Sequence, residues 1–228
     1  MAANGQWSMK KIATSIAVAA VLWFLMFSPW TAPYLPFWWC MTASACVLTT
    51  LALTFGGKDC LGIPSKTINP IDPNSPIDPI NHMSKLFLGL AITVGLWVAF
   101  FVGDKVSQWM FDFARPQVNL IYGMKDGMSP LTLSLLLLCV IGPAEEIFWR
   151  GFIQRSLSAR YSPTLAFIVT TAIYTLVHLP SGNFMLIMAA LVCGIAWGGL
   201  YWLWPNRLPS IIISHAVWDA AAFVWFPF

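Results

Sequence analysis

Long apolar runs separated by short polar stretches make up most of the chain. Seven of these runs are long enough, or nearly so, to cross a bilayer, which takes about 20 residues. The runs are residues 12–28, 36–55, 85–103, 131–160, 163–179, 184–204 and 208–228. The pattern predicts an all-α, polytopic membrane helix bundle of about seven transmembrane helices, which form a single transmembrane domain over residues 1–228.

Two polar stretches interrupt the apolar pattern. Residues 58–84 form a hydrophilic linker in which Pro-Ile-Asp-Pro occurs at 70–73 and again at 76–79. Because proline lacks a backbone donor and favours extended geometry, we expect a spacer without helix here. Residues 104–130 mix aromatic with charged side chains, which predicts an interfacial amphipathic helix that lies on the membrane and ends by Pro116.

The composition supports the membrane prediction. The chain is 58% hydrophobic and only 9% charged, whereas a soluble domain carries about 25% charged residues. The net charge of +3 is small and scattered, so nucleic acid is not an expected partner. Four of the five cysteines lie in apolar runs and no Cys-x-x-Cys occurs, which indicates buried small hydrophobes rather than disulfides or metal ligands. We expect no metal and no other cofactor.

The basic residues predict the orientation. With seven spans, nine of the twelve lysines and arginines fall on the side of the N-terminus. The other three, Lys105, Arg115 and Lys125, fall on the opposite side. Because cytoplasmic loops carry an excess of basic residues, the N-terminus is predicted to be cytoplasmic.

The only two glutamates of the chain, Glu145 and Glu146, stand side by side in the fourth apolar run. A charged side chain at the bilayer centre costs about 2.5–3.5 kcal/mol on insertion scales, so two of them need a reason. On a helix, Glu146 and Arg150 share a face and can pair, whereas Glu145 points about 100° away and stays available. The alternative is an ion pair that only locks helix packing, but it leaves Glu145 unexplained.

Three further polar residues lie in apolar surroundings. His178 is near the end of the fifth run, and His215 and Asp219 share a helix face in the seventh. Each has a simpler explanation, an interhelical hydrogen bond for His178 and a self-satisfying pair for the other two. Because polar residues of a bundle converge on its interior, we expect all three to meet Glu145 in one site.

Such a group of residues favours hydrolysis by activated water. A carboxylate in a cavity of low dielectric can act as a general base near neutral pH. Imidazoles can orient the water and donate to a developing oxyanion, and Asp219 can fix the tautomer of His215. No serine or cysteine is placed in the sequence as a nucleophile partner for these groups, so the predicted reaction is amide hydrolysis by glutamate-activated water.

Three motifs together resemble the CAAX prenyl protease type II (CPBP) family, whose members are glutamate-dependent intramembrane endopeptidases. The motifs are Glu-Glu-x-x-x-Arg at Glu145, Glu146 and Arg150, Tyr-x-x-x-His at Tyr174 and His178, and His-x-x-x-Asp at His215 and Asp219. The similarity covers about residues 131–222. In many members the second motif begins with Phe and the third ends with Asn.

The resemblance implies a role for each residue. Glu145 would activate the water, His178 would help to hold it, and His215 and Asp219 would line the oxyanion site. Since a carboxylate donates only when protonated, Asp219 is expected to orient His215 instead. The supporting residues would be Glu146, Arg150 and Tyr174.

The depths of these residues pose a difficulty. At 1.5 Å per residue, Glu145 and His178 each lie about 22 Å from the turn after Arg160, but His215 lies only about 10 Å beyond Leu208. We therefore expect tilted spans, a break at Pro143, or an early end of the sixth span near its Gly-Gly pair at 198–199.

The predicted function is an intramembrane endopeptidase that cuts a membrane-associated peptide or a C-terminal tail. Compact length and short loops indicate a bacterial protein of the cytoplasmic membrane, with the lipid bilayer and a peptide or protein substrate as partners. A zinc-dependent membrane protease with His178, His215 and a glutamate as ligands is an alternative, although His-Glu-x-x-His is absent. A proton pathway or transporter, and a non-enzymatic membrane partner of immunity or maturation type, are further alternatives.

Overall fold

The computed structural model describes residues 8–62 and 79–228. Within these two ranges the regular structure is entirely helical and contains no strand. Seven helical segments in them are long and apolar enough to cross a membrane. The predicted all-α membrane bundle is therefore confirmed.

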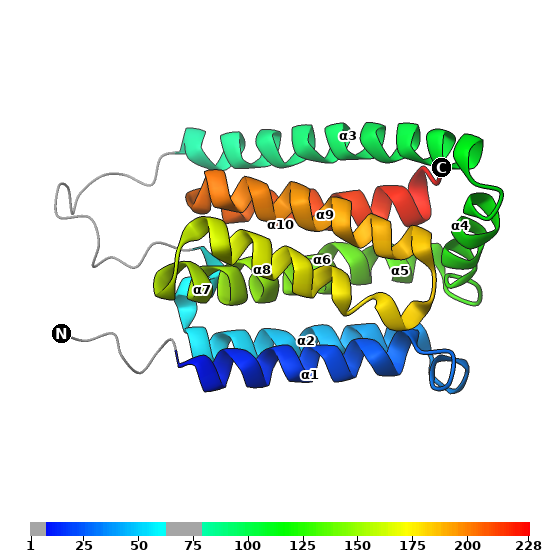
Figure 1. Cartoon of the computed structure of the whole chain (residues 1–228). Coiled ribbons are helices and arrows are strands. Elements are labelled where there is room, and N and C mark those ends of the chain that lie inside the picture. The colour runs from blue at the N-terminus through cyan, green and yellow to red at the C-terminus, as the bar shows by residue number, and fades with distance from the viewer. Residues whose placement is uncertain (1–7, 63–78) are drawn as a thin grey trace, which may run out of the picture.

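The helices run along a common direction, with α3 at one edge of the bundle and the α1–α2 pair at the other (Figure 1). The short helix α4 closes the end of the bundle that lies opposite the beginning of α1. The α-helices outside the fourth span are α1 (Met9–Phe27), α2 (Phe37–Gly56), α3 (Pro79–Met110), α4 (Ala114–Gly123), α8 (Pro163–Leu176), α9 (Phe184–Leu203) and α10 (Leu208–Ala220).

The fourth span is one continuous helical rod, as predicted, but two π-helical segments interrupt its α-helical winding. Its segments are α5 (Pro130–Leu136), the π-helical η4 (Leu137–Ile141), α6 (Gly142–Glu146), the π-helical η5 (Ile147–Gln154) and α7 (Arg155–Arg160). Short π segments inside α-helices often occur at functional sites. Here they flank the two glutamates on both sides.

Both predictions for the polar stretches need correction. The linker repeats at 70–73 and 76–79 fall largely on residues 63–78, outside the described residues. On either side of that gap the expected absence of helix is wrong, because 58–61 form a 3-10 turn and α3 begins at Pro79. The apolar helix α3 continues seven residues beyond the predicted end at 103, so Asp104 belongs to a span.

The predicted interfacial helix was also misplaced. Instead of ending by Pro116, the short helix α4 begins at Ala114 and runs to Gly123. Proline is tolerated in the first turn of a helix because the amide it lacks has no partner there, so Pro116 opens this helix rather than closing it.

Small residues let the core helices approach closely. A Cβ built on Gly142 would lie 2.7 Å from the Cα of Ala216, so α6 and α10 meet at backbone distance. On the other side of α10, the Thr93 hydroxyl of α3 donates to the Ser214 carbonyl at 3.2 Å. Small side chains at helix interfaces favour such contacts in membranes.

This packing sets the depth of the predicted site. Because Gly142 lies beside Ala216, the glutamates of α6 come level with His215 of α10. The sixth span does not end early, since α9 continues through the Gly-Gly pair at 198–199 to Leu203. The change in winding falls next to Pro143 rather than as a full break.

Candidate active site

One cavity of about 580 Å³ contains the predicted polar residues of the spans. Glu145, Tyr174, His178, His215 and Asp219 all line it. The other two supporting residues, Glu146 and Arg150, do not line the cavity. Both are almost completely buried, with exposed fractions of 0% and 1%. The structure thus brings residues of three separate spans together.

Glu145 faces the cavity and contacts the second motif. Its side chain is 6% exposed, and its Oε2 accepts a hydrogen bond of 3.2 Å from the Tyr174 hydroxyl. Tyr174 belongs to α8, so this bond joins the fourth span to the fifth. Tyr174 therefore supplies a polar contact that a phenylalanine at this position would lack.

Glu146 connects two cationic or potentially cationic groups. Its Oε1 accepts from Arg150 Nη1 at 2.9 Å, as the spacing predicted, and lies 2.6 Å from His215 Nδ1. A buried carboxylate is tolerated when such partners compensate for its lost hydration. The contact with His215 was not predicted, because sequence spacing gives no contact between different spans.

His215 lies between two carboxylates. Beyond Glu146, its Nε2 is 3.4 Å from Asp219 Oδ2, one turn later in α10. The indole of Trp197 stacks on the ring with 3.8 Å between centroids and 16° between planes. Both ring nitrogens can donate to carboxylates when the imidazole is protonated, and an aromatic face stabilises a cation above it.

His178 has protein partners at both ring nitrogens. Nδ1 lies 2.7 Å from the Tyr174 carbonyl, and because a carbonyl oxygen can only accept, Nδ1 must carry the proton. Nε2 then accepts a hydrogen bond of 3.2 Å from the indole of Trp23 in α1. Trp23 is 0% exposed, and its contact with His178 was not predicted.

Arg150 holds the rear of the site together. Its guanidinium lies 4.9 Å from the ring centroid of Tyr174 and 6.0 Å from that of Trp197. Cation–π contacts of this kind stabilise a buried guanidinium. Arg150 therefore contacts one residue beside Glu145 and another beside His215.

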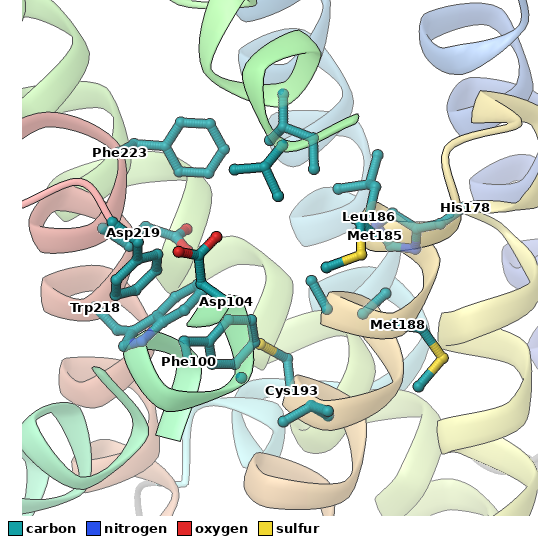
Figure 2. Close-up of a pocket in the computed structure, with 18 of the residues that line it drawn as sticks. Phe100, Asp104, His178, Met185, Leu186, Met188, Cys193, Trp218, Asp219 and Phe223 are labelled. Atoms are coloured by element: carbon teal, nitrogen blue, oxygen red, sulfur yellow. The ribbon is translucent and has the colours of Figure 1, made fainter. Parts of the chain in front are cut away.

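The rest of the described cavity wall is mainly apolar and contains one further charged residue. Figure 2 shows methionine and aromatic side chains around the space, with His178 on one side and Asp219 on the other. This charged residue is Asp104, from α3. Asp104 was not predicted as a site residue.

Comparison with known proteins agrees with the three motifs. Residues 127–221 match the family model described as type II CAAX prenyl endopeptidase, Rce1-like. This segment belongs to that family. The match supports a CAAX-type intramembrane protease, and together with the seven apolar helices of the described residues it supports an integral, multi-pass membrane protein. No curated protein and no solved structure matches the chain.

The zinc alternative requires several metal-ligating side chains placed close together. Among residues 8–62 and 79–228, no group of three or more His, Cys, Asp or Glu side chains is placed to hold a metal ion. In the type II CAAX protease segment, His178 and His215 instead contact Trp23 and Glu146. Sensitivity of purified activity to a chelator is the measurement that separates the two chemistries.

Proposed function

We propose that this protein is a glutamate-type intramembrane endopeptidase in which Glu145 activates a water molecule for attack on a peptide bond. The observation that carries the proposal is the placement of Glu145 in a largely apolar cavity shared with His178 and His215. A carboxylate in such surroundings is poorly solvated and can take a proton from water in the transition state.

The proposed steps balance as follows. Glu145 takes a proton from the water, and the water oxygen bonds to the scissile carbonyl carbon. The carbonyl oxygen becomes an oxyanion, which an N–H group can stabilise. Collapse of the tetrahedral intermediate breaks the C–N bond, and the proton held by Glu145 passes to the leaving amine.

His215 is the proposed donor to the oxyanion. Its Nδ1 is held by Glu146 at 2.6 Å, while Nε2 has the looser contact of 3.4 Å with Asp219. A protonated ring held at Nδ1 can direct its Nε2–H to a new acceptor. Asp219 then orients the ring in the resting enzyme and is not itself a donor.

The proposed role of His178 requires a change of partner. Since Nδ1 is bound to the Tyr174 carbonyl, only Nε2 could hold the water, and Trp23 occupies it. We therefore propose that the indole of Trp23 moves away from Nε2 when water and substrate enter. Tyr174 supports Glu145 through its hydroxyl, and Arg150 supports the charge on Glu146.

The proposed substrate is a peptide or protein with a membrane-associated segment, such as a C-terminal tail. The cavity is deep among the spans and mainly apolar, so it fits a chain that arrives from the lipid rather than from water. The proposed location is the bacterial cytoplasmic membrane, with the N-terminus in the cytoplasm.

The test is Glu145→Gln. The glutamine oxygen can still accept from Tyr174, so the fold should persist while general-base catalysis is lost, and turnover should fall by roughly 10²–10⁴-fold or more. Mass spectrometry of membrane peptides should then show products in cells with the native protein and none with the variant. Asp126→Asn removes an exposed carboxylate and is the matched control. Unchanged processing with Glu145→Gln would overturn the proposal.

A further inference from the structure

Asp104 is a buried carboxylate that the proposed hydrolysis does not use. It is only 6% exposed, although α3 lies at the edge of the bundle. A carboxylate at this depth of an apolar wall is costly unless it has partners or a function. Its position follows from that of Phe100, one turn earlier in α3, whose ring lies 4.6 Å from that of Trp218. Asp104 therefore lies on the face of α3 that looks toward α10 and the cavity.

The two oxygens of Asp104 have different surroundings. Oδ2 accepts from Gln108 Nε2 at 2.6 Å and from Lys105 Nζ at 3.1 Å. Oδ1 is buried and has no hydrogen-bond partner among the described residues. Its nearest cation is Arg115 Nη1, at an ion-pair distance of 3.8 Å. A buried acceptor of this kind is stabilised by any donor that reaches it.

The charge of the cavity wall indicates which donor fits. Three carboxylates line the cavity, those of Asp104, Glu145 and Asp219, and no lysine or arginine is among the described lining residues. Lys105 and Arg115 lie outside it, with side chains 55% and 43% exposed. The one cation proposed in the wall, protonated His215, is flanked by Glu146 and Asp219, so the remaining carboxylates still favour a positively charged group.

We propose that Asp104, with the apolar wall around it, forms a subsite for one basic side chain, Lys or Arg, of the peptide substrate. This inference rests on the proposed endopeptidase function. The charged group would take the place of Arg115 beside the Asp104 carboxylate once the Arg115 side chain moves aside and uncovers Oδ1. Its methylene stem would lie along the wall near Phe100 and Phe111. Figure 2 shows Asp104 on the same side of the cavity as Asp219 and opposite His178.

The subsite lies away from the scissile bond. Asp104 is near the end of α3 that meets α4, whereas Glu145 is in the middle of the fourth span. The basic residue therefore occupies one fixed position in the substrate, between the cleaved bond and the membrane face covered by α4. The segment that fits this cavity would be apolar, with a single basic residue near one end.

The experiment profiles cleavage of a peptide library. The native full-length protein, purified in detergent micelles, is incubated with apolar peptides of mixed sequence, and the products are identified by mass spectrometry. The native enzyme should enrich Lys and Arg at one position relative to Gln. Asp104→Asn should still cleave but lose this preference, by on the order of tenfold to a hundredfold.

Three controls separate the explanations. Arg115→Gln removes the ion pair between α3 and α4 but keeps the carboxylate, so the preference for basic residues should persist. Asp126→Asn, an exposed carboxylate near the same end, should also keep it. Glu145→Gln should cleave nothing, and if the native enzyme cleaves nothing either, it is the endopeptidase proposal that fails.

Two results would overturn the subsite while leaving the protease intact. One is a native enzyme that cleaves without preferring Lys or Arg over Gln at any position, a measurement that does not depend on how the variant folds. The other is an equal loss of preference in Arg115→Gln and Asp104→Asn, which would assign Asp104 to helix packing alone.

Discussion

Glu145 and Glu146 are adjacent in the sequence but differ in what they contact. Glu145 faces the cavity and accepts one hydrogen bond from Tyr174, whereas Glu146 is fully buried between Arg150 and His215. Removing one partner of a buried ion pair leaves the other charge uncompensated. The two glutamates should therefore fail in different ways when each is replaced by glutamine.

Glu146→Gln should lower the free energy of unfolding by roughly 3–5 kcal/mol, because Arg150 and His215 both lose their carboxylate. Glu145→Gln should change stability by much less while it removes activity. Thermal unfolding of the two variants in the same detergent measures the difference. Equal melting temperatures would contradict the assignment of Glu146 as the buried counter-ion.

Trp23 offers a second test at the scale of single residues. Trp23→Phe removes the donor to His178 Nε2 and should destabilise the protein by about 1 kcal/mol, since a buried acceptor is left unpaired. Turnover per folded molecule should not fall, because the Nδ1 bond to the Tyr174 carbonyl still fixes the tautomer. The measurements are thermal unfolding and active-enzyme-normalised rates.

Trp149→Phe is the matched control. Trp149 packs edge-on against Trp23, is equally buried, and its indole N–H has no partner among the described residues. Its replacement should leave the hydrogen bonds of His178 in place. If Trp23→Phe lowers turnover while Trp149→Phe does not, the indole would have to act in catalysis rather than occupy Nε2 at rest.

Among the helices, the contact between α6 and α10 determines whether the site forms. Gly142→Ala would place a Cβ 2.7 Å from Ala216 Cα, so α10 must shift away from the glutamates. Overpacking of this kind costs typically about 1–3 kcal/mol, and activity should fall with the displaced His215. Thermal unfolding and the cleavage rate both test this expectation.

Gly95→Ala in α3 is the control for that substitution. A Cβ at Gly95 meets nothing within 4 Å, so the change should be neutral in packing and slightly favourable to the helix. A comparable loss of activity in both variants would show that helix composition, and not the α6–α10 approach, is responsible.

The sequence predicted the positions of the helices better than the contacts between them. Apolar runs located all seven spans because lipid requires long apolar segments. The motif spacing also predicted the pair of Glu146 and Arg150, since one helix turn fixes it. The extension of α3 was missed because Asp104, Lys105 and Asp112 follow the apolar run closely and look like the start of a loop.

Contacts between distant segments could not be predicted, because local sequence carries no mark of them. Trp23 stands in an ordinary apolar run, 155 residues before His178, and nothing local marks it. The π-helical segments around the glutamates were missed too, because their sequences carry the same apolar residues as an α-helix. Only tertiary packing distinguishes these cases.

For the whole molecule, the orientation in the membrane remains a prediction that labelling can test. Arg160 is the last residue of the fourth span and Asp126 precedes its first residue, so they lie at opposite ends of this span. With the N-terminus cytoplasmic, an impermeant thiol reagent should label Asp126→Cys in intact cells and Arg160→Cys only after permeabilisation. The background should lack Cys40, Cys46 and Cys139, which are at least partly exposed. The reverse labelling pattern would invert the orientation.

Trp23, which donates to His178, and Asp104, which lines the cavity, both belong to helices that precede residue 127, where the family match begins. A fragment cut at the boundaries of that match would lose the donor to His178 and one wall of the chamber. A fragment limited to the matched residues should therefore have a cavity that is open on one side, and it should show no peptidase activity. Any chimaera that transplants this activity would have to carry the first and third spans along with the motifs.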